Sequence, residues 1–261
     1  MPPTKRRGET QLTCEEANKS RLVTLCRWVV ETINGRFKRD FKIFRYRVFN
    51  RALPSTMTDY KIAAALINAF QEPYEDSQQF VDIINRNMHK PNLLADYVIE
   101  HNLNRHRAAF VRLEKNDQTL EDFPRLSQEE LILFAVGTYH CKIARTYCSE
   151  HIKQTGVYEI EVYRHPVLVT INGESGVLIR CRIQSRHVRN RTYYTYILYR
   201  RKTGINAISE HYCSCIHGKR TLGSCAHIMS VLYYMGWARY QDDFNHPGYT
   251  LEDVIIDLEN Q

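Results

Sequence analysis

The sequence predicts an α+β protein, in which a helical N-terminal half is followed by a small antiparallel sheet and a C-terminal strand–loop–helix. Three observations predict this class. Apolar residues recur every three or four positions as far as about residue 152, which is the helical period. Between residues 157 and 200 they alternate with polar residues, which is the period of strands. Three of the eight cysteines then fall within residues 213–225, with a histidine at 227.

The helical half begins with a predicted helix within residues 15–50. Its apolar stripe, which we expect to be buried, consists of Leu22, Cys26, Val29, Ile33 and Phe37. A second helix is predicted over residues 57–70, and its buried side consists of Ile62, Leu66, Ala69 and Phe70. Shorter helices are predicted within residues 77–88 and 92–103. A capping box from Ser127 to Glu130 predicts the start of a helix that extends to about Ile152.

The strands follow in three segments rich in β-branched and aromatic residues, at 157–165, 175–187 and 191–200. In the second segment Val177, Ile179, Cys181 and Ile183 are expected on one side of the sheet, with Leu178, Arg180, Arg182 and Gln184 on the other. A further strand is expected to end near Cys213, and a helix is expected from about Ala226 to Trp237.

Cys213, Cys215, Cys225 and His227 form the pattern C-x-C-x9-C-x-H. Zinc binds four such thiolate and imidazole ligands in a tetrahedron. Residues two apart on a strand face the same side, so the first two thiols can point together at a strand end. The last two ligands are expected at the entrance to the helix. Four protein ligands leave no open position, so one structural zinc ion is predicted rather than a catalytic one.

Two alternatives stay open at this point. The cysteines can instead be small buried residues of the core, accompanied by a surface histidine. His211 or His217 can also take the place of His227 as the fourth ligand. The number of ligand types at two short spacings favours a metal site over unrelated buried thiols.

This pattern on a strand, loop and helix resembles the SWIM-type zinc finger, over about residues 195–237, and all four ligand positions match. SWIM fingers occur in transposases, in transposon-derived transcription factors and in some proteins of the ubiquitin pathway. The resemblance therefore implies a module that binds DNA or a protein, and it does not specify which.

The net charge of +7 is unevenly distributed. Residues 1–51 carry 13 Lys and Arg against 5 Asp and Glu, and residues 156–202 carry 9 against 3. The candidate nucleic-acid-binding residues of the second segment are Arg180, Arg182, Arg186, Arg189, Arg191, Arg200, Arg201 and Lys202. Arginine binds phosphates and the interleaved tyrosines can stack on bases, so DNA is a candidate partner. The alternative to DNA binding is that these arginines form an ordinary solvent-exposed face of the sheet.

A polar face of the first helix carries Arg27, Glu31, Asn34 and Lys38. Spacing alone favours an ordinary exposed face. The surrounding segments "EANKSRLVT" and "RWVVETINGRFK" nevertheless resemble the region around the third catalytic acid of Harbinger-like and related DDE-type transposases. Arg27, Glu31 and Lys38 match the pattern R-x3-E-x6-K of that helix, whereas Thr24 stands where some relatives have tyrosine.

In that family three carboxylates hold two divalent metal ions that drive strand cleavage and joining. The resemblance would place two aspartates upstream of Glu31, where this sequence has only a short polar leader. Met1 is then expected to correspond to an internal methionine of a longer transposase. One carboxylate cannot assemble a two-metal site, so we expect Glu31 to be a non-functional remnant in the isolated chain.

These resemblances imply a division of the chain into four parts. Residues 1–110 would be a mainly helical remnant of an RNase H-like transposase domain, and 111–155 a helical connector. Residues 156–240 would form the sheet and finger, followed by an acidic tail at 241–261.

The predicted function is that of a zinc-dependent DNA- or protein-binding protein of transposon origin. The alternatives are a truncated part of an active transposase and a protein adaptor of the ubiquitin-pathway type. No apolar run is long enough for a membrane span, and no Gly-rich phosphate loop or Ser/His/Asp signature indicates a small-molecule substrate. Nothing marks the chain for secretion, so the nucleus or cytoplasm is expected.

Overall fold

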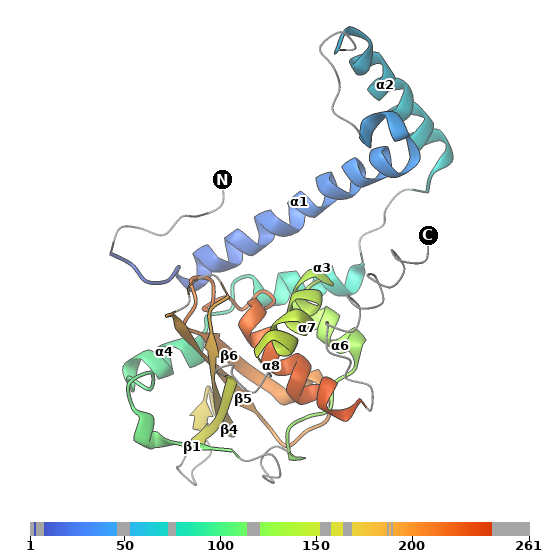
Figure 1. The fold of residues 1–261 in the computed structure, drawn as a ribbon. Coiled ribbons are helices and arrows are strands. Elements are labelled where there is room, and N and C mark those ends of the chain that lie inside the picture. Colours follow the sequence, from blue (N-terminus) through green and yellow to red (C-terminus); the bar gives the residue numbers. More distant parts are fainter. Residues whose placement is uncertain are drawn as a thin grey trace, which may run out of the picture.

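The computed structural model describes residues 3, 8–45, 53–72, 77–113, 121–151, 158–163, 169–186, 188 and 190–241. Within these residues the chain forms seven α-helices and one six-stranded antiparallel sheet (Figure 1). The predicted α+β class is confirmed. Among the helices of the described ranges, none combines the length and the apolar character that crossing a membrane requires.

The sheet has the order β1-β2-β4-β5-β6, and the short β3 also pairs with β4. Its strands are β1 (Phe110–Arg112), β2 (Tyr158–Tyr163), β3 (Val169–Ile171), β4 (Glu174–Gln184), β5 (Thr192–Tyr199) and β6 (Ile208–Cys213). The four predicted strands are present as β2, β4, β5 and β6. The sequence reasoning missed β1 and β3, because three residues are too few to display an alternation.

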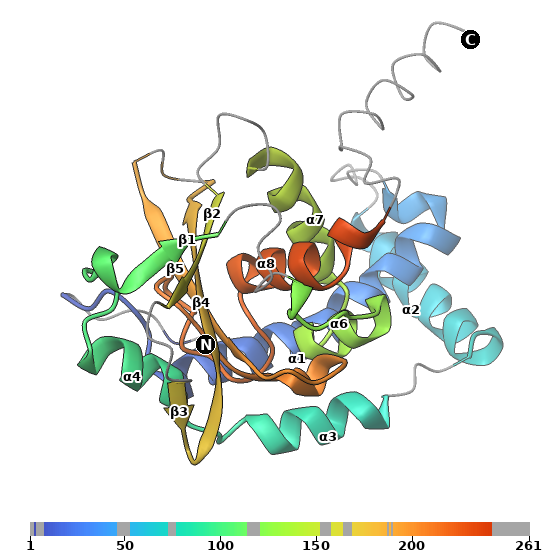
Figure 2. The ribbon, with the colours of Figure 1, turned by 90° about the horizontal axis from the view of Figure 1, so that it is seen from below.

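Both faces of the sheet are covered, as Figure 2 shows. The helices α6 (Gln128–Ala135), α7 (Tyr139–His151) and α8 (Ala226–Gly236) pack on the face that carries Ile179 and Ile183. The helix α4 (Leu93–Glu100) packs on the opposite face, against Leu178 and Tyr196. The core therefore consists of two layers, one on each side of the sheet.

The remaining helices precede this body. They are α1 (Cys14–Asp40), the 3-10 turn η1 (Lys42–Arg45), α2 (Leu53–Phe70) and α3 (Gln78–Asn87). A capping box between Thr13 and Glu16 starts α1. The C-terminal part of α1 and the whole of α2 project away from the sheet as an arm (Figure 1). Phe37 of α1 packs against Tyr60 of α2, with ring centroids 5.3 Å apart.

The two apolar stripes predicted to be buried are largely exposed in the arm. On α1, Val29 is 58% and Ile33 is 37% exposed, and on α2, Leu66 is 41% and Phe70 is 82% exposed. The prediction of burial was therefore wrong for these residues. The periodicity correctly located the helices, but α2 contacts α1 around Phe37, and of the α1 stripe only Leu22 and Phe37 are half-buried.

The long helix predicted from Ser127 to Ile152 is interrupted. Its capping box is present, but α6 ends at Ala135 and α7 begins at Tyr139. Val136 and Gly137 adopt positive φ angles of 53° and 126°, which end a helix. Short 3-10 turns complete the described fold: η3 (Arg107–Ala109), η4 (Ile205–Ala207) and η5 (Ala238–Tyr240).

The predicted division into four parts stays a prediction. Phe110 belongs to β1 and pairs with Tyr163 of β2, so strand pairing crosses the boundary expected after residue 110. Apart from Gln241, the acidic tail at 241–261 lies outside the described residues.

Candidate metal centre

The four predicted ligands come from two neighbouring elements. Cys213 is the last residue of β6, and Cys215 follows in the turn after it. Cys225 is the N-cap of α8, and His227 lies in the first turn of that helix. The structure therefore brings a strand end and a helix entrance together, as the spacing predicts.

The ligand atoms of these residues form one compact, buried group. The three Sγ atoms and the imidazole nitrogen all lie within 4.8 Å of one another, and all four residues are buried. The Cys213 Sγ lies 3.8 Å from Nδ1 of His227. A tetrahedral zinc site has ligand-to-ligand edges of about 3.8 Å, which follows from bonds of about 2.3 Å to sulfur. The group could thus hold a metal ion through three sulfurs and one nitrogen.

The alternative fourth ligands are not part of this group, which contains His227 and neither His211 nor His217. His211 points its ring toward Phe134, at a centroid distance of 5.1 Å. Burial lowers the pKa of His211 to about 4, so this side chain is neutral at pH 7.

A tight turn holds the first two cysteines in place. The backbone N–H of Cys215 points at the Cys213 Sγ over 3.4 Å. The Cys213 N–H donates to the Gly218 carbonyl over 3.0 Å, and the Gly218 N–H donates to the Cys215 carbonyl over 2.9 Å. A Cβ on residue 218 would lie 1.9 Å from the Cys213 oxygen, so only glycine permits this approach.

The three thiols of the site do not ionise equally. Burial raises the pKa of the Cys213 thiol well above its usual value. Burial acts in the same direction on Cys225, but hydrogen bonds from Cys213 and Cys215 outweigh it and hold the pKa of Cys225 well below its usual value. Three clustered thiols therefore cannot all ionise unless a positive charge lies among them.

Arg220 is a buried cation beside the three cysteines, and its surroundings are compatible with a bound metal ion. Its side chain is buried, with the residue only 6% exposed, and within the described part of the chain no carboxylate pairs with it. Burial lowers its pKa, while the neighbouring Cys225, Cys215 and Cys213 act in the opposite direction. Zinc with three thiolates and a neutral imidazole carries a single net negative charge. The Cys225 thiol, whose pKa is held low, already places a negative charge beside the buried guanidinium, and such a centre would keep the same net charge there.

Two tyrosines surround the outer side of the histidine ligand. The Tyr147 hydroxyl lies 3.1 Å from Nε2 of His227, and the Tyr193 ring lies 4.5 Å from the imidazole centroid. Hydrogen bonding at Nε2 leaves Nδ1 as the nitrogen that faces the three sulfurs. Sequence reasoning missed Tyr147, because no spacing links α7 to the motif, and it missed Arg220, although this residue lies in the loop between Cys215 and Cys225.

The predicted basic surface does not form one patch. Arg180 is fully buried and its Nε donates to Glu161 over 2.6 Å, so it cannot contact DNA in this structure. Arg182 is paired with Glu159 over 2.6 Å. The alternation placed both on the outer face, but α4 and β1 cover that face around Arg180.

The other basic residues lie at two opposite ends of β5. Arg200 donates to Ser209 over 2.7 Å, Arg201 pairs with Asp122 over 2.9 Å, and Lys202 is exposed. Arg186 and Arg191 lie at the other end, next to the metal centre. Their guanidinium groups lie over the rings of Tyr147 and Tyr193 at 5.0 and 5.3 Å. Arg189 lies outside the described residues.

The residues that resemble the transposase motif lie on the exposed arm. Arg27 and Glu31 form an ion pair of 3.4 Å, and both side chains are more than half exposed. Lys38 is also exposed. Among the described residues, no group of metal-ligating side chains includes Glu31.

Comparison of the chain with protein-family models, with curated proteins and with solved structures finds no match. The resemblance to SWIM fingers and to DDE-type transposases therefore rests on the residues alone. The structure shows in addition that Cys213, Cys215, Cys225 and His227 form one buried group.

Proposed function

We propose that this chain is a non-catalytic binding protein of transposon origin whose C-terminal part is a SWIM-type finger held together by one structural zinc ion. The observation that carries the proposal is the closed donor set. Four buried protein ligands within 4.8 Å of one another would fill the coordination of zinc and leave no position for a substrate. The metal would thus support a surface rather than a reaction.

DNA is the first candidate partner, and the supporting residues lie beside the metal centre. Arg186 lies over the ring of Tyr147 in α7, and Arg191 lies over the ring of Tyr193 at the start of β5. Arg200, Arg201 and Lys202 follow the other end of this strand, which has eight residues and a length of about 25 Å. A DNA backbone bound at the finger would therefore contact the first pair. Nuclear localisation belongs to this proposal.

A protein partner is the second candidate, and the exposed arm favours it. Trp28, Val30 and Phe70 are 61%, 62% and 82% exposed. Apolar exposure on this scale is typical of surfaces that bind other proteins. An adaptor role of the ubiquitin-pathway type would use such a surface.

The zinc proposal is tested by metal content and by unfolding. We expect one zinc per chain after expression, and we expect chelation or Cys225→Ser to melt α8 and the turn after β6 while α4 resists longer. A protein without zinc, with unchanged melting on chelation, would refute the proposal.

The partner is tested by salt-dependent DNA binding. Replacement of both Arg186 and Arg191 by alanine should weaken binding and reduce its salt dependence, because phosphate contacts release counterions. Arg201→Ala is the matched control, since Arg201 is exposed but lies at the far end of β5. Absence of any salt-dependent binding would favour the protein partner. With magnesium or manganese we expect no DNA cleavage; cleavage that depends on Glu31 would instead support the transposase alternative.

A further inference from the structure

A short N-terminal segment, residues 11–21, contacts both halves of the candidate metal centre although it is about 200 positions away in sequence. Gln11 contacts the first half. Its Nε2 donates to the carbonyl oxygens of Cys213 and Cys215, both over 2.7 Å. The next residue, Leu12, donates its backbone N–H to the Ile216 carbonyl over 3.0 Å. The turn that contains Cys213 and Cys215 is therefore hydrogen-bonded to residues outside the cysteine motif.

Asn18 contacts the second half. It is 1% exposed, and its Oδ1 accepts the backbone N–H groups of Thr221 and Leu222, each over 2.9 Å. Its Nδ2 donates to the Thr221 hydroxyl over 2.8 Å and to the Met88 carbonyl over 2.9 Å. Asn18 thus fixes the loop that leads into Cys225.

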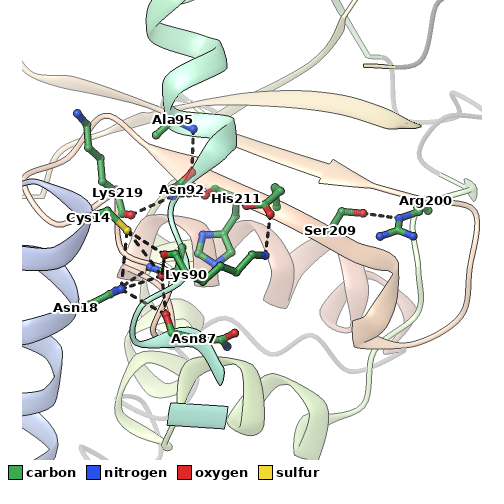
Figure 3. A network of polar contacts seen from close by, with 12 residues as sticks. Cys14, Asn18, Asn87, Lys90, Asn92, Ala95, Arg200, Ser209, His211 and Lys219 are labelled. Atoms are coloured by element: carbon green, nitrogen blue, oxygen red, sulfur yellow. Dashed lines mark hydrogen bonds and ion pairs between the residues drawn. The ribbon is translucent and has the colours of Figure 1, made fainter. Parts of the chain in front are cut away.

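The same network extends to the segment between α3 and α4, which Figure 3 shows beside α1. The Thr221 hydroxyl lies 2.9 and 2.8 Å from the carbonyl oxygens of Asn87 and Lys90. Asn92 caps α4 and donates to the carbonyl oxygens of His211 and Lys219 over 2.9 and 3.1 Å. The loop before Cys225 is therefore tied to α1 and to α4 simultaneously.

Arg21 adds a third contact one turn further along α1. Its Nη2 donates to the carbonyl oxygens of Ala135 and Val136 over 2.9 and 2.8 Å, which caps the end of α6. Gly223 packs against this same helix end, because a Cβ on it would lie 2.9 Å from the Ala135 oxygen. Asn18 and Arg21 are three positions apart and so share one face of the helix.

These contacts are also the anchor of the arm. Of the 27 residues of α1, only Ala17, Asn18 and Arg21 are buried. The helix has 27 residues and is therefore about 40 Å long, and its part beyond Arg21 carries the exposed apolar residues Trp28, Val29 and Val30. Whatever loosens the loop around Thr221 therefore loosens the contacts of Asn18, which are one of the two buried attachments of α1, the other being Arg21 at the end of α6.

We infer that Gln11 and Asn18 are positioning residues of the metal centre, and that metal binding and the anchoring of the α1–α2 arm are thermodynamically coupled. The inference rests on the proposed zinc site. The metal holds the turn after Cys213 and the loop before Cys225 in one arrangement, and this is the arrangement to which residues 11–21 bind. Such coupling is reciprocal. If bound metal strengthens the N-terminal contacts by a given factor, then removing these contacts must weaken metal binding by the same factor.

The first test is the zinc affinity of full-length variants, measured by competition with a chromophoric chelator. Gln11→Ala and Asn18→Ala should each bind zinc about ten-fold more weakly or worse, which is the usual effect of residues that orient metal ligands. Asn34→Ala is the matched control, because Asn34 is an exposed asparagine on the same helix. Cobalt spectra of the variants should retain the three-thiolate absorption, since the ligands themselves are unchanged.

The second test is hydrogen exchange of the wild-type chain with zinc bound and after chelation. Amides of residues 15–24 should exchange at least ten-fold faster without metal, whereas those of β2, near the opposite edge of the sheet from β6, should change less. Equal zinc affinity of both alanine variants and the wild type, or equal exchange of α1 in the two states, would overturn the coupling and leave the zinc proposal standing. Absence of zinc binding to the wild-type chain would overturn both.

Discussion

Alanine at position 218 would place a methyl group inside the turn that presents two of the candidate ligands. Its Cβ would lie 1.9 Å from the oxygen of Cys213, 2.5 Å from the carbonyl carbon and 2.7 Å from the Cys213 Cβ. These obstructing atoms belong to a ligand residue and mostly to its backbone, so no side-chain rotation relieves the overlap. We expect the turn to open and the Cys213 and Cys215 thiols to separate.

The cost follows from the overlap and from the hydrogen bonds that break. Inserting a methyl group into a packed site costs about 1–3 kcal/mol. The bonds from Cys213 N–H to Gly218 and from Gly218 N–H to Cys215 would be lost, at about 0.5–1.5 kcal/mol each. The total is about 2–6 kcal/mol. Because metal binding and folding of such a site are one process, the same free energy should appear as at least about thirty-fold weaker zinc binding.

Gly35→Ala is the matched control for this experiment. Gly35 lies in α1, and a Cβ on it would meet nothing within 4 Å, so the change should stabilise the helix by up to about 1 kcal/mol. Zinc competition and urea unfolding of both variants provide the measurements. If Gly218→Ala bound zinc as tightly as the wild type and unfolded at the same urea concentration, the geometric reasoning would be refuted.

Two further predictions concern buried charge. Arg180→Met should lower the free energy of unfolding by about 3 kcal/mol in urea, because it leaves the Glu161 carboxylate, whose side chain is only 13% exposed, without its partner. Adding Glu161→Leu should recover much of the loss. An unchanged free energy of unfolding in the single variant would contradict the ion pair. Burial lowers the pKa of His140 to about 3, so the folded state stays neutral while the unfolded histidine takes up a proton near its ordinary value of 6.5. The contribution of this residue to the free energy of unfolding is therefore fully present above about pH 6.5. It decreases by about 1.4 kcal/mol per pH unit as the pH falls toward 3. In His140→Gln the free energy of unfolding should therefore fall less steeply between pH 7 and pH 5 than in the wild type. Equal slopes in the two proteins would show that His140 is not held as a neutral side chain in the folded state.

Local signals in the sequence predicted most of the elements. The capping box at Ser127, the alternation in β4 and β5, and the spacing of the cysteines act over a few residues each. The four ligands are brought together because Cys213 ends a strand and Cys225 begins a helix. Where a pattern was too short, as in β1, or a helix was interrupted, as at Val136, the local signal was insufficient.

Periodicity was a poor guide to burial. It identified the apolar face of α1 through Val29 and Ile33, but a helix face is buried only where another element covers it, and α2 covers little of it. The opposite error occurred at Arg180. Alternation placed it toward solvent, whereas the outer face of β4 is covered and the guanidinium lies 3.8 Å over the Phe110 ring.

By itself the sequence determined the α+β class, the order of most helices and strands, and the four candidate ligands, because each depends on the chemistry of residues close together in the chain. Only the tertiary structure decided what surrounds those ligands. Asn18 and Tyr147 come from distant parts of the chain and carry no motif of their own, and Arg220 lies within the loop of the motif but nothing in the spacing marks it. Contacts between residues up to about 200 positions apart depend on how the layers pack, and this packing determines which arginines are buried, which apolar stripe stays exposed, and how α1 is attached beside the candidate metal centre.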